Sequence, residues 1–203
     1  MADFHEICAR DVTEEMIREA ERKGWDPESF GTETVFLSAR DWGCLKREIR
    51  ERREEADVLV YEGGDEEMNR KVCGDSRLDI LIHPGKGRKD SGFNHVMAEE
   101  AAENRVALGL DFSRLWTSDR EQSHVMSEWR RNLKICEKYG VDYVLTTKPE
   151  DRYELRAPRD LAAILNVLGH DGEAAVTGNP GEIISRNRER TEDSFVRPGV
   201  REE

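Results

Sequence analysis

The sequence predicts an α/β fold, in the form of an incomplete TIM-like βα barrel with about seven parallel strands and surrounding helices. Short runs of apolar and β-branched residues recur along the chain and favour strands. These runs are residues 4–8, 34–37, 58–61, 80–82, 106–110, 143–146 and, more weakly, 174–177. Charged segments of helical composition separate them, at residues 13–23, 41–55, 65–73, 94–104, 119–139, 158–168 and 180–190. Each predicted strand and the helical segment that follows it together take roughly 25 to 35 residues, which is the length of a βα repeat.

The predicted strands are nearly continuous in apolar residues, which is typical of parallel strands covered on both faces. Seven units of this kind could form an open doubly wound sheet or a closed barrel. The GxGxxG fingerprint of dinucleotide-binding doubly wound folds is absent from the sequence. The regular repeat therefore favours a barrel. A usual eight-unit barrel needs about 250 residues, so a chain of 203 residues predicts a shortened one.

The length fits one domain, which we expect over residues 1–190, followed by a flexible polar tail over residues 191–203. No run of residues is apolar enough to span a membrane, and the first residues lack the features of a signal peptide. The four cysteines stand apart from one another and read as small core residues of a protein in a reducing compartment. We therefore expect a cytoplasmic protein with no membrane partner.

The net charge of −12 makes the chain as a whole a poor general binder of polyanions. The charge is uneven, however. Residues 76–160 hold 15 Lys and Arg against 15 Asp and Glu, whereas residues 1–75 hold 12 against 21. The acidic surface fits either a salt-rich cytoplasm, where salt screens self-repulsion, or an ordinary acidic protein. The middle of the chain therefore carries no net charge, whereas the first 75 residues are strongly acidic.

A cluster of cations follows the predicted strand ends in this middle part. The run Ile80–Ile82 ends in His83-Pro84, and the glycine-rich loop GKGRKDSG comes next. Ligands of α/β proteins usually bind at the carboxyl ends of the strands, and Arg and Lys suit phosphate groups. The candidate phosphate-binding residues at this rim are Lys86, Arg88, Lys89, Lys148, Arg152, Arg156 and Arg159.

A second set of cations lies along the predicted helix over residues 119–139. Arg130, Lys134 and Lys138 recur at helical spacing, beside an apolar stripe on a neighbouring face. Arg130 and Lys134 are therefore further candidates for binding phosphate. The alternative is an ordinary solvated face, in which Glu128 or Glu137 pairs with these cations.

A metal-dependent phosphoesterase site is the rival interpretation of the strand ends. Its candidate ligands are His5, His83 and Asp111, which follow or end predicted strands. A site with two or three metal ions needs a dense set of histidines and carboxylates, and only five histidines are present. We therefore expect no metal site on the chain. Serine or cysteine nucleophilic catalysis has no supporting motif.

Four blocks of the sequence together resemble the archaeal ribonuclease P protein component 3 family, which has a eukaryotic counterpart of the thirty-kilodalton class. The blocks are LDILIHPGKGRKDSGFNHVMAEEAAENRVALGLDF, WRRNLKICEKYGVDYVLTT, ELRAPRDLAAILNVLG and NPGEIISRNRER. The first resembles the family's His-Pro turn, basic loop and Gly-x-x-His-Val segment. The combination is specific, although no single block would be.

The resemblance implies a barrel related to the polymerase-and-histidinol-phosphatase phosphoesterases but without their metal site. It implies a subunit of ribonuclease P, the endoribonuclease that removes 5′ leaders from precursor tRNA during tRNA processing. The RNA of that ribonucleoprotein would carry the catalytic magnesium ions, so the polypeptide alone would have no catalytic residue and no cofactor. The implied partners are the ribonuclease P RNA, protein component 2, the other ribonuclease P proteins and, indirectly, precursor tRNA. The alternative is a stand-alone metal-dependent phosphoesterase of the same barrel superfamily.

Overall fold

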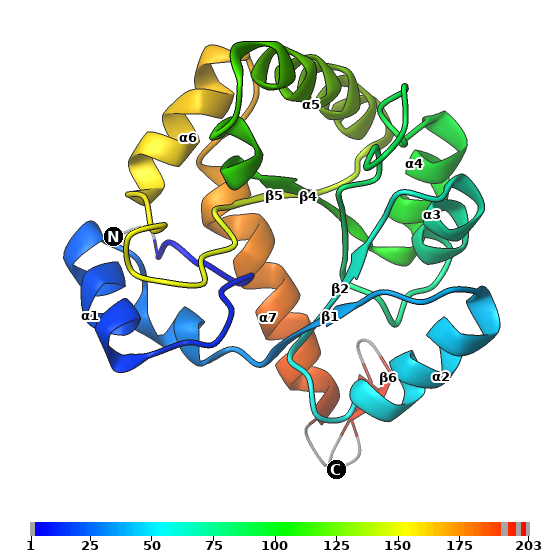
Figure 1. The fold of residues 1–203 in the computed structure, drawn as a ribbon. Coiled ribbons are helices and arrows are strands. Elements are labelled where there is room, and N and C mark those ends of the chain that lie inside the picture. Colours follow the sequence, from blue (N-terminus) through cyan, green and yellow to red (C-terminus); the bar gives the residue numbers. More distant parts are fainter. Residues whose placement is uncertain (1–2, 192–194, 198–199, 202–203) are drawn as a thin grey trace.

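A parallel sheet of five strands forms the centre of the molecule (Figure 1). The structure, a computed structural model, describes residues 3–191, 195–197 and 200–201. The strands of the sheet are β1 (Thr34–Leu37), β2 (Val58–Glu62), β3 (Ile80–Ile82), β4 (Ala107–Asp111) and β5 (Tyr143–Thr146). They pair in sequence order, so the chain winds in one direction. A doubly wound sheet would reverse its strand order, and this alternative is therefore wrong.

Helices surround the sheet and connect its strands. They are α1 (Glu14–Lys23), α2 (Trp42–Arg52), α3 (Glu66–Cys73), α4 (His95–Asn104), α5 (Asp119–Tyr139), α6 (Pro158–Val167) and α7 (Gly178–Thr191). Short 3-10 helices occur at η1 (Pro27–Gly31), η2 (Phe112–Leu115) and η3 (Ala174–Val176). In Figure 1, α1 to α6 lie around the periphery and α7 crosses the middle of the ring. Within the described residues, no helix is both long and apolar enough to traverse a bilayer.

Two of the seven predicted strands do not form. Residues 4–8 are an extended segment without strand pairing, and Ala174–Val176 is the 3-10 helix η3. These two segments nevertheless meet, because the backbone N–H of His5 donates to the carbonyl of Val176 at 2.8 Å. The Thr34 hydroxyl donates to the carbonyl of Ile7 at 2.7 Å, which fixes the first segment beside β1 without a ladder of backbone hydrogen bonds.

Both faces of the sheet are buried, as the apolar strands predict. Leu59, Leu81 and Leu108 lie in the larger core beneath the peripheral helices. Alternate strand residues point to the other face, where they pack against Ile183 and Ile184 of α7. The residues of this smaller core are Ile7, Cys8, Val58, Val60, Ile80, Ile82, Ala107, Val144, Ile183 and Ile184. The sheet is thus covered on one face by the helical layer and on the other by α7 together with Ile7 and Cys8 of the N-terminal segment.

A buried carboxylate joins α7 and α2 to the amino end of β3. Asp79 has no exposed surface and accepts from Arg53 at 2.6 Å and from Arg186 at 2.9 Å. It also accepts from the backbone N–H of Leu59 at 2.8 Å. Because a buried charge is costly unless it is paired, this triad ties together three elements that are distant in sequence.

Cys8, Cys73 and Cys136 are buried as expected, but Cys44 is only partly buried, because its thiol points to Asp41 at the start of α2.

The predicted tail over residues 191–203 lies largely outside the described residues. Its described parts, Phe195–Arg197 (β6) and Val200–Arg201 (β7), pair as a short antiparallel hairpin. Tail flexibility and the single-domain boundary at residue 190 stay predictions.

Candidate functional site

Polar side chains gather where the strands end. Glu62 is the last residue of β2, His83 follows β3, Asp111 ends β4 and Thr146 ends β5. His83 and Lys148 have left-handed backbone angles, with φ of 54° and 46°. Such angles are unfavourable for residues other than glycine and concentrate at functional sites. A catalytic or binding site is therefore most expected at the carboxyl edge of the sheet.

His83 and Asp111 form a close pair at this edge. Nε2 of His83 lies 2.8 Å from Oδ2 of Asp111, whose side chain is almost fully buried. The other carboxylate oxygen accepts from the backbone N–H and hydroxyl of Ser113. Burial would raise the pKa of Asp111, but the hydrogen bonds from His83 and Ser113 outweigh it and hold the pKa below its usual value. Asp111 is thus a satisfied carboxylate.

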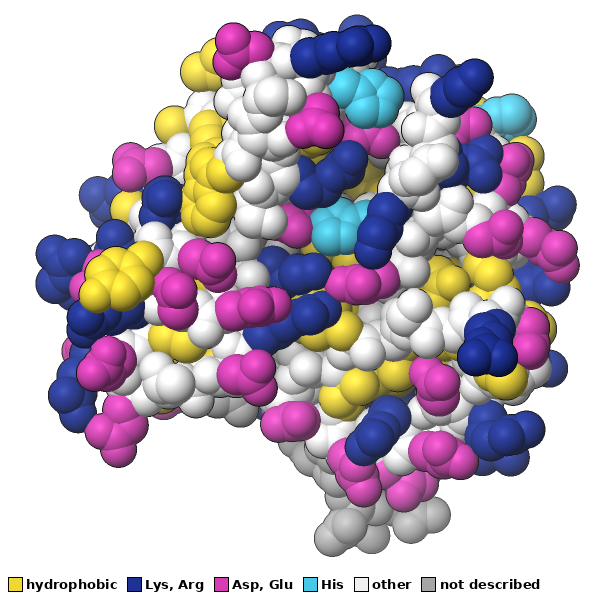
Figure 2. All heavy atoms as spheres, viewed as in Figure 1, with side chains coloured by type: hydrophobic (Ala, Val, Ile, Leu, Met, Phe, Trp, Pro, Cys, Tyr) yellow, Lys and Arg dark blue, Asp and Glu magenta, His cyan; other side chains and the backbone are white. Residues whose placement is uncertain are grey.

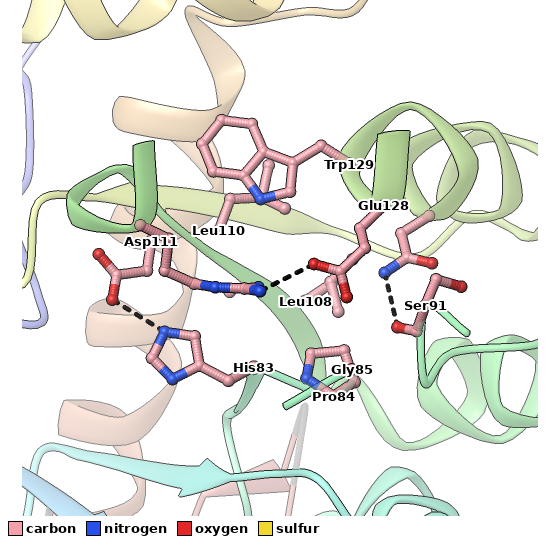
Figure 3. A pocket seen from close by; sticks show the side chains of 12 residues that line it. His83, Pro84, Gly85, Ser91, Leu108, Leu110, Asp111, Glu128 and Trp129 are labelled. Carbon is pink, nitrogen blue, oxygen red and sulfur yellow. Dashed lines mark hydrogen bonds and ion pairs between the residues drawn. The ribbon is translucent and has the colours of Figure 1, made fainter. Parts of the chain in front are cut away.

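The space beside this pair is filled by protein side chains (Figure 3). Glu128 of α5 is buried and accepts from Arg114 at 2.9 Å. Glu128 also packs on Gly85, where an added Cβ would lie only 2.0 Å from its carboxylate oxygen. The remaining cavity measures about 10 Å³, the room of about one water molecule. A phosphate ester does not fit into this space.

A cluster of cations surrounds Glu62 at the neighbouring strand end. Its carboxylate lies 2.9 Å from Nζ of Lys148, 3.0 Å from Nη2 of Arg10 and 3.9 Å from Nζ of Lys86. Burial would raise the pKa of Glu62, but Lys148 above all outweighs it and lowers the pKa. Arg10 also lies 3.9 Å above the ring of Phe36. Figure 2 shows basic and acidic side chains interleaved at the centre of this face.

Glu6 and Arg10 belong to this edge and were missed by the sequence analysis. Glu6 is 1% exposed and accepts from the Thr146 hydroxyl and from the backbone N–H groups of Cys8 and Thr147. Burial raises the pKa of Glu6 to about 7. A lone acidic residue inside the apolar run Phe4–Cys8 was the available signal.

His5 does not join His83 and Asp111. Its Nδ1 lies 3.3 Å from Asp26, and its ring packs near Gly181 at the start of α7. Among the residues that the structure describes, no group of three or more His, Cys, Asp and Glu side chains could hold a metal ion. The candidate ligands of the phosphoesterase interpretation are therefore divided between two places.

The predicted phosphate-binding cations fall into two groups, and the first is paired with carboxylates. Arg88 contacts Asp90 at 2.7 Å and Glu66 at 3.0 Å. Arg152 contacts Glu15 at 3.1 Å. Lys86 and Lys148 share Glu62, as described above. These cations are at the predicted rim, but part of their charge is already neutralised within the protein.

The second group has no carboxylate within ion-pair distance among the described residues. Arg156 donates to the carbonyl of Tyr153 and lies 4.5 Å from the Trp116 ring. The other members of this group are Lys89, Arg130, Lys134 and Arg159, and all four are exposed. The two expected acidic partners of the α5 stripe are engaged elsewhere: Glu128 pairs with Arg114 and Glu137 with His170.

Comparison with known proteins identifies the family. Residues 33–192 match the model of the family described as "RNase P subunit p30". Ribonuclease P protein component 3 of Methanothermobacter thermautotrophicus is 32% identical over 173 residues, covering 82% of this chain and 69% of that protein. The protein of the same name from Haloarcula marismortui is 35% identical over 152 residues, covering 73% of this chain and 64% of that protein.

A solved structure has a similar fold. A chain in the cryo-EM structure of archaeal ribonuclease P with mature tRNA superposes with a TM-score of 0.78 at 29% sequence identity. The match covers 96% of this chain and 85% of that one. The chain therefore belongs to the RNase P subunit p30 family, whose members are protein subunits of ribonuclease P.

Proposed function

We propose that this polypeptide is a non-catalytic subunit that supports the ribonuclease P RNA while that RNA removes 5′ leaders from precursor tRNA. One observation carries the proposal. Arg114 and Glu128 fill the space beside His83 and Asp111 at the ends of β3 and β4, and the cavity that remains there measures about 10 Å³. A reacting phosphate and its attacking water need more room than this.

The catalytic magnesium ions would then belong to the RNA, and the protein would contribute positive charge. A cation that contacts a backbone phosphate releases counterions and relieves repulsion between RNA strands. Less magnesium is then needed to keep the RNA folded. The rim cations without carboxylate partners, Lys89, Arg156 and Arg159, are suited to this role. Arg88 and Lys148 are less suited, because they would first have to leave their internal ion pairs.

The partners of such a subunit are the ribonuclease P RNA, protein component 2 and the other ribonuclease P proteins, with precursor tRNA contacted indirectly. We expect the complex to work in the cytoplasm. We also infer that the ring is an incomplete barrel. The His5–Val176 hydrogen bond and the contacts of Glu6 with Thr146 and Thr147 support this, because they bridge the gap between β5 and β1.

The test is cleavage of precursor tRNA by archaeal ribonuclease P RNA with component 2, with and without this chain, at low magnesium. We expect cleavage to require both the RNA and the chain. The chain alone is the control, and cleavage by the chain alone would overturn the proposal. His83→Gln separates the two interpretations further, since it should leave RNA-dependent cleavage intact, whereas a phosphoesterase centred on His83 would lose its activity.

A further inference from the structure

Four cations lie on the exposed side of the long helix α5, and we refer to them as the α5 basic face. They are Arg130, Arg131, Lys134 and Lys138. The opposite side of α5 is buried through Val125, Trp129, Leu133 and Cys136. Packing of this apolar stripe fixes the rotation of the helix, so the basic residues must face outward.

These cations make few acidic contacts within the described residues, although Arg131 lies near enough to Asp90 to contribute, after Arg88, to the lowered pKa of that carboxyl group. Some exposed cations on other helices do pair locally, as in Arg18 with Glu14 at 2.8 Å and Lys71 with Glu67 at 2.5 Å. No ion pair involves the α5 basic face within the part of the chain that the structure describes. In a chain with a net charge of −12, an unneutralised basic surface indicates an anionic partner.

The α5 basic face borders a groove of about 390 Å³. Arg131, Lys134, Lys138 and Tyr139 line it from α5, and Asn94 and His95 line it from the start of α4. No carboxylate is among the lining residues. The Gly-x-x-His-Val segment of the sequence thus places an exposed imidazole opposite three cations. Figure 2 shows Lys and Arg side chains along the upper edge of the molecule, above α5.

We propose that this groove between α4 and α5 binds backbone phosphates of the ribonuclease P RNA. This rests on the proposed function and adds a site that lies apart from the strand ends. Arg131, Lys134 and Lys138 span about 10 Å along the helix, from a rise of about 1.5 Å per residue. A row of charges of this length suits a short run of phosphates on one strand. Lys138 already lies 4.8 Å from the ring of Tyr139, and this ring offers a surface for a ribose or base.

The site should be energetically accessible, because binding breaks no internal ion pair. A phosphate that reaches Arg88 competes with Asp90 and Glu66, whereas one that reaches Lys134 competes with no carboxylate of the described residues. This difference favours the α5 basic face over the paired part of the rim as the stronger RNA contact.

The experiment compares two triple variants of the full chain that change the charge equally. The test variant is Arg131→Gln, Lys134→Gln and Lys138→Gln. The matched control is Arg18→Gln, Arg22→Gln and Lys71→Gln, whose cations pair locally with glutamates. Affinity for the ribonuclease P RNA is measured against salt concentration, and the melting temperature of each variant confirms that it is folded.

We expect the test variant to reduce the slope of log affinity against log salt by about 2 to 3, since each lost phosphate contact removes about 0.7 to 0.9. The control should leave the slope near the wild-type value. Equal slopes for both triple variants would overturn the proposal, because the effect would then be one of net charge. A test variant that keeps its RNA slope but no longer binds component 2 would also overturn it, and the face would then be a protein contact.

Cleavage in the reconstituted complex separates this proposal from the proposed function. If the wild-type chain and the test variant stimulate cleavage equally at low magnesium, the groove assignment fails while the subunit role stands. If the wild-type chain gives no stimulation, the subunit role itself fails.

Discussion

Replacement of Glu6 by glutamine should abolish a loss of stability that the wild-type protein undergoes between about pH 4.5 and pH 7. Burial raises the pKa of Glu6 from 4.5 to about 7. Between these values the folded protein holds a proton that the unfolded chain has released, so the free energy of unfolding falls as the pH rises. The stabilising effect of the proton is complete below pH 4.5 and is lost above pH 7.

The magnitude follows from the size of the shift. One pKa unit corresponds to 1.36 kcal/mol, so a shift from 4.5 to about 7 amounts to about 3 kcal/mol. The assay is urea unfolding of both proteins at several pH values from 4.5 to 8. The difference in unfolding free energy between Glu6→Gln and wild type should move by about 3 kcal/mol in favour of the variant across this range.

The stability that Glu6→Gln loses by replacing a carboxylate with an amide does not affect the pH dependence of the difference. A glutamine cannot accept from both the Cys8 and Thr147 N–H groups as the carboxylate does, but this penalty is the same at every pH. Glu54→Gln, at an exposed position, corrects for the change in net charge. If the difference in unfolding free energy between Glu6→Gln and wild type stays constant from pH 4.5 to 8, the reasoning is refuted. That result would mean that hydrogen bonds from Thr146 and the backbone stabilise the ionised form as much as burial opposes it.

Three further substitutions probe the packing around the sheet, each measured by urea unfolding. Asp79→Ala should cost about 3 to 5 kcal/mol, since it leaves two partly buried arginines unpaired; a loss below 1 kcal/mol would contradict this. Gly92→Ala should cost about 2 kcal/mol or more, because φ is +66° and the new Cβ would lie 1.9 Å from the Pro84 carbonyl oxygen; wild-type stability would contradict it. Arg114→Ala should cost about 1 to 3 kcal/mol by leaving the buried Glu128 carboxylate unpaired. Addition of Glu128→Ala should recover part of that loss in a double-mutant cycle, and simple additivity would show that the pair does not interact.

Local patterns predicted most of the elements correctly. The helix expected over residues 119–139 is α5 (Asp119–Tyr139), and its apolar stripe is buried as the spacing of Val125, Trp129 and Leu133 requires. Five strands appear where continuous apolar runs stood. The two failures, at residues 4–8 and 174–177, are short runs whose backbone groups found partners outside a strand ladder. Strand formation depends on a neighbour, and the sequence does not show which neighbour is in reach.

The structure brings His83 and Asp111 together at the strand ends, whereas His5 lies apart from them beside Asp26. His83, Asp111 and the rim cations lie at the strand ends because parallel strands of one sheet end at a common edge. Sequence spacing could not show that Glu128, on a helix far along the chain, would fill the space beside His83. Ion pairs between distant residues, such as Lys148 with Glu62, were equally invisible.

The sequence by itself determined the class of fold, the order of its elements, the basic rim and the family, because periodicity and short motifs are local properties of the chain. The tertiary structure alone decided which charges are available. It directs Glu128 to Arg114 and Glu137 to His170, and so leaves the α5 basic face without an ion pair among the residues that the structure describes. The physical reason is that Coulomb interactions depend on distance in space, which only the packed chain defines.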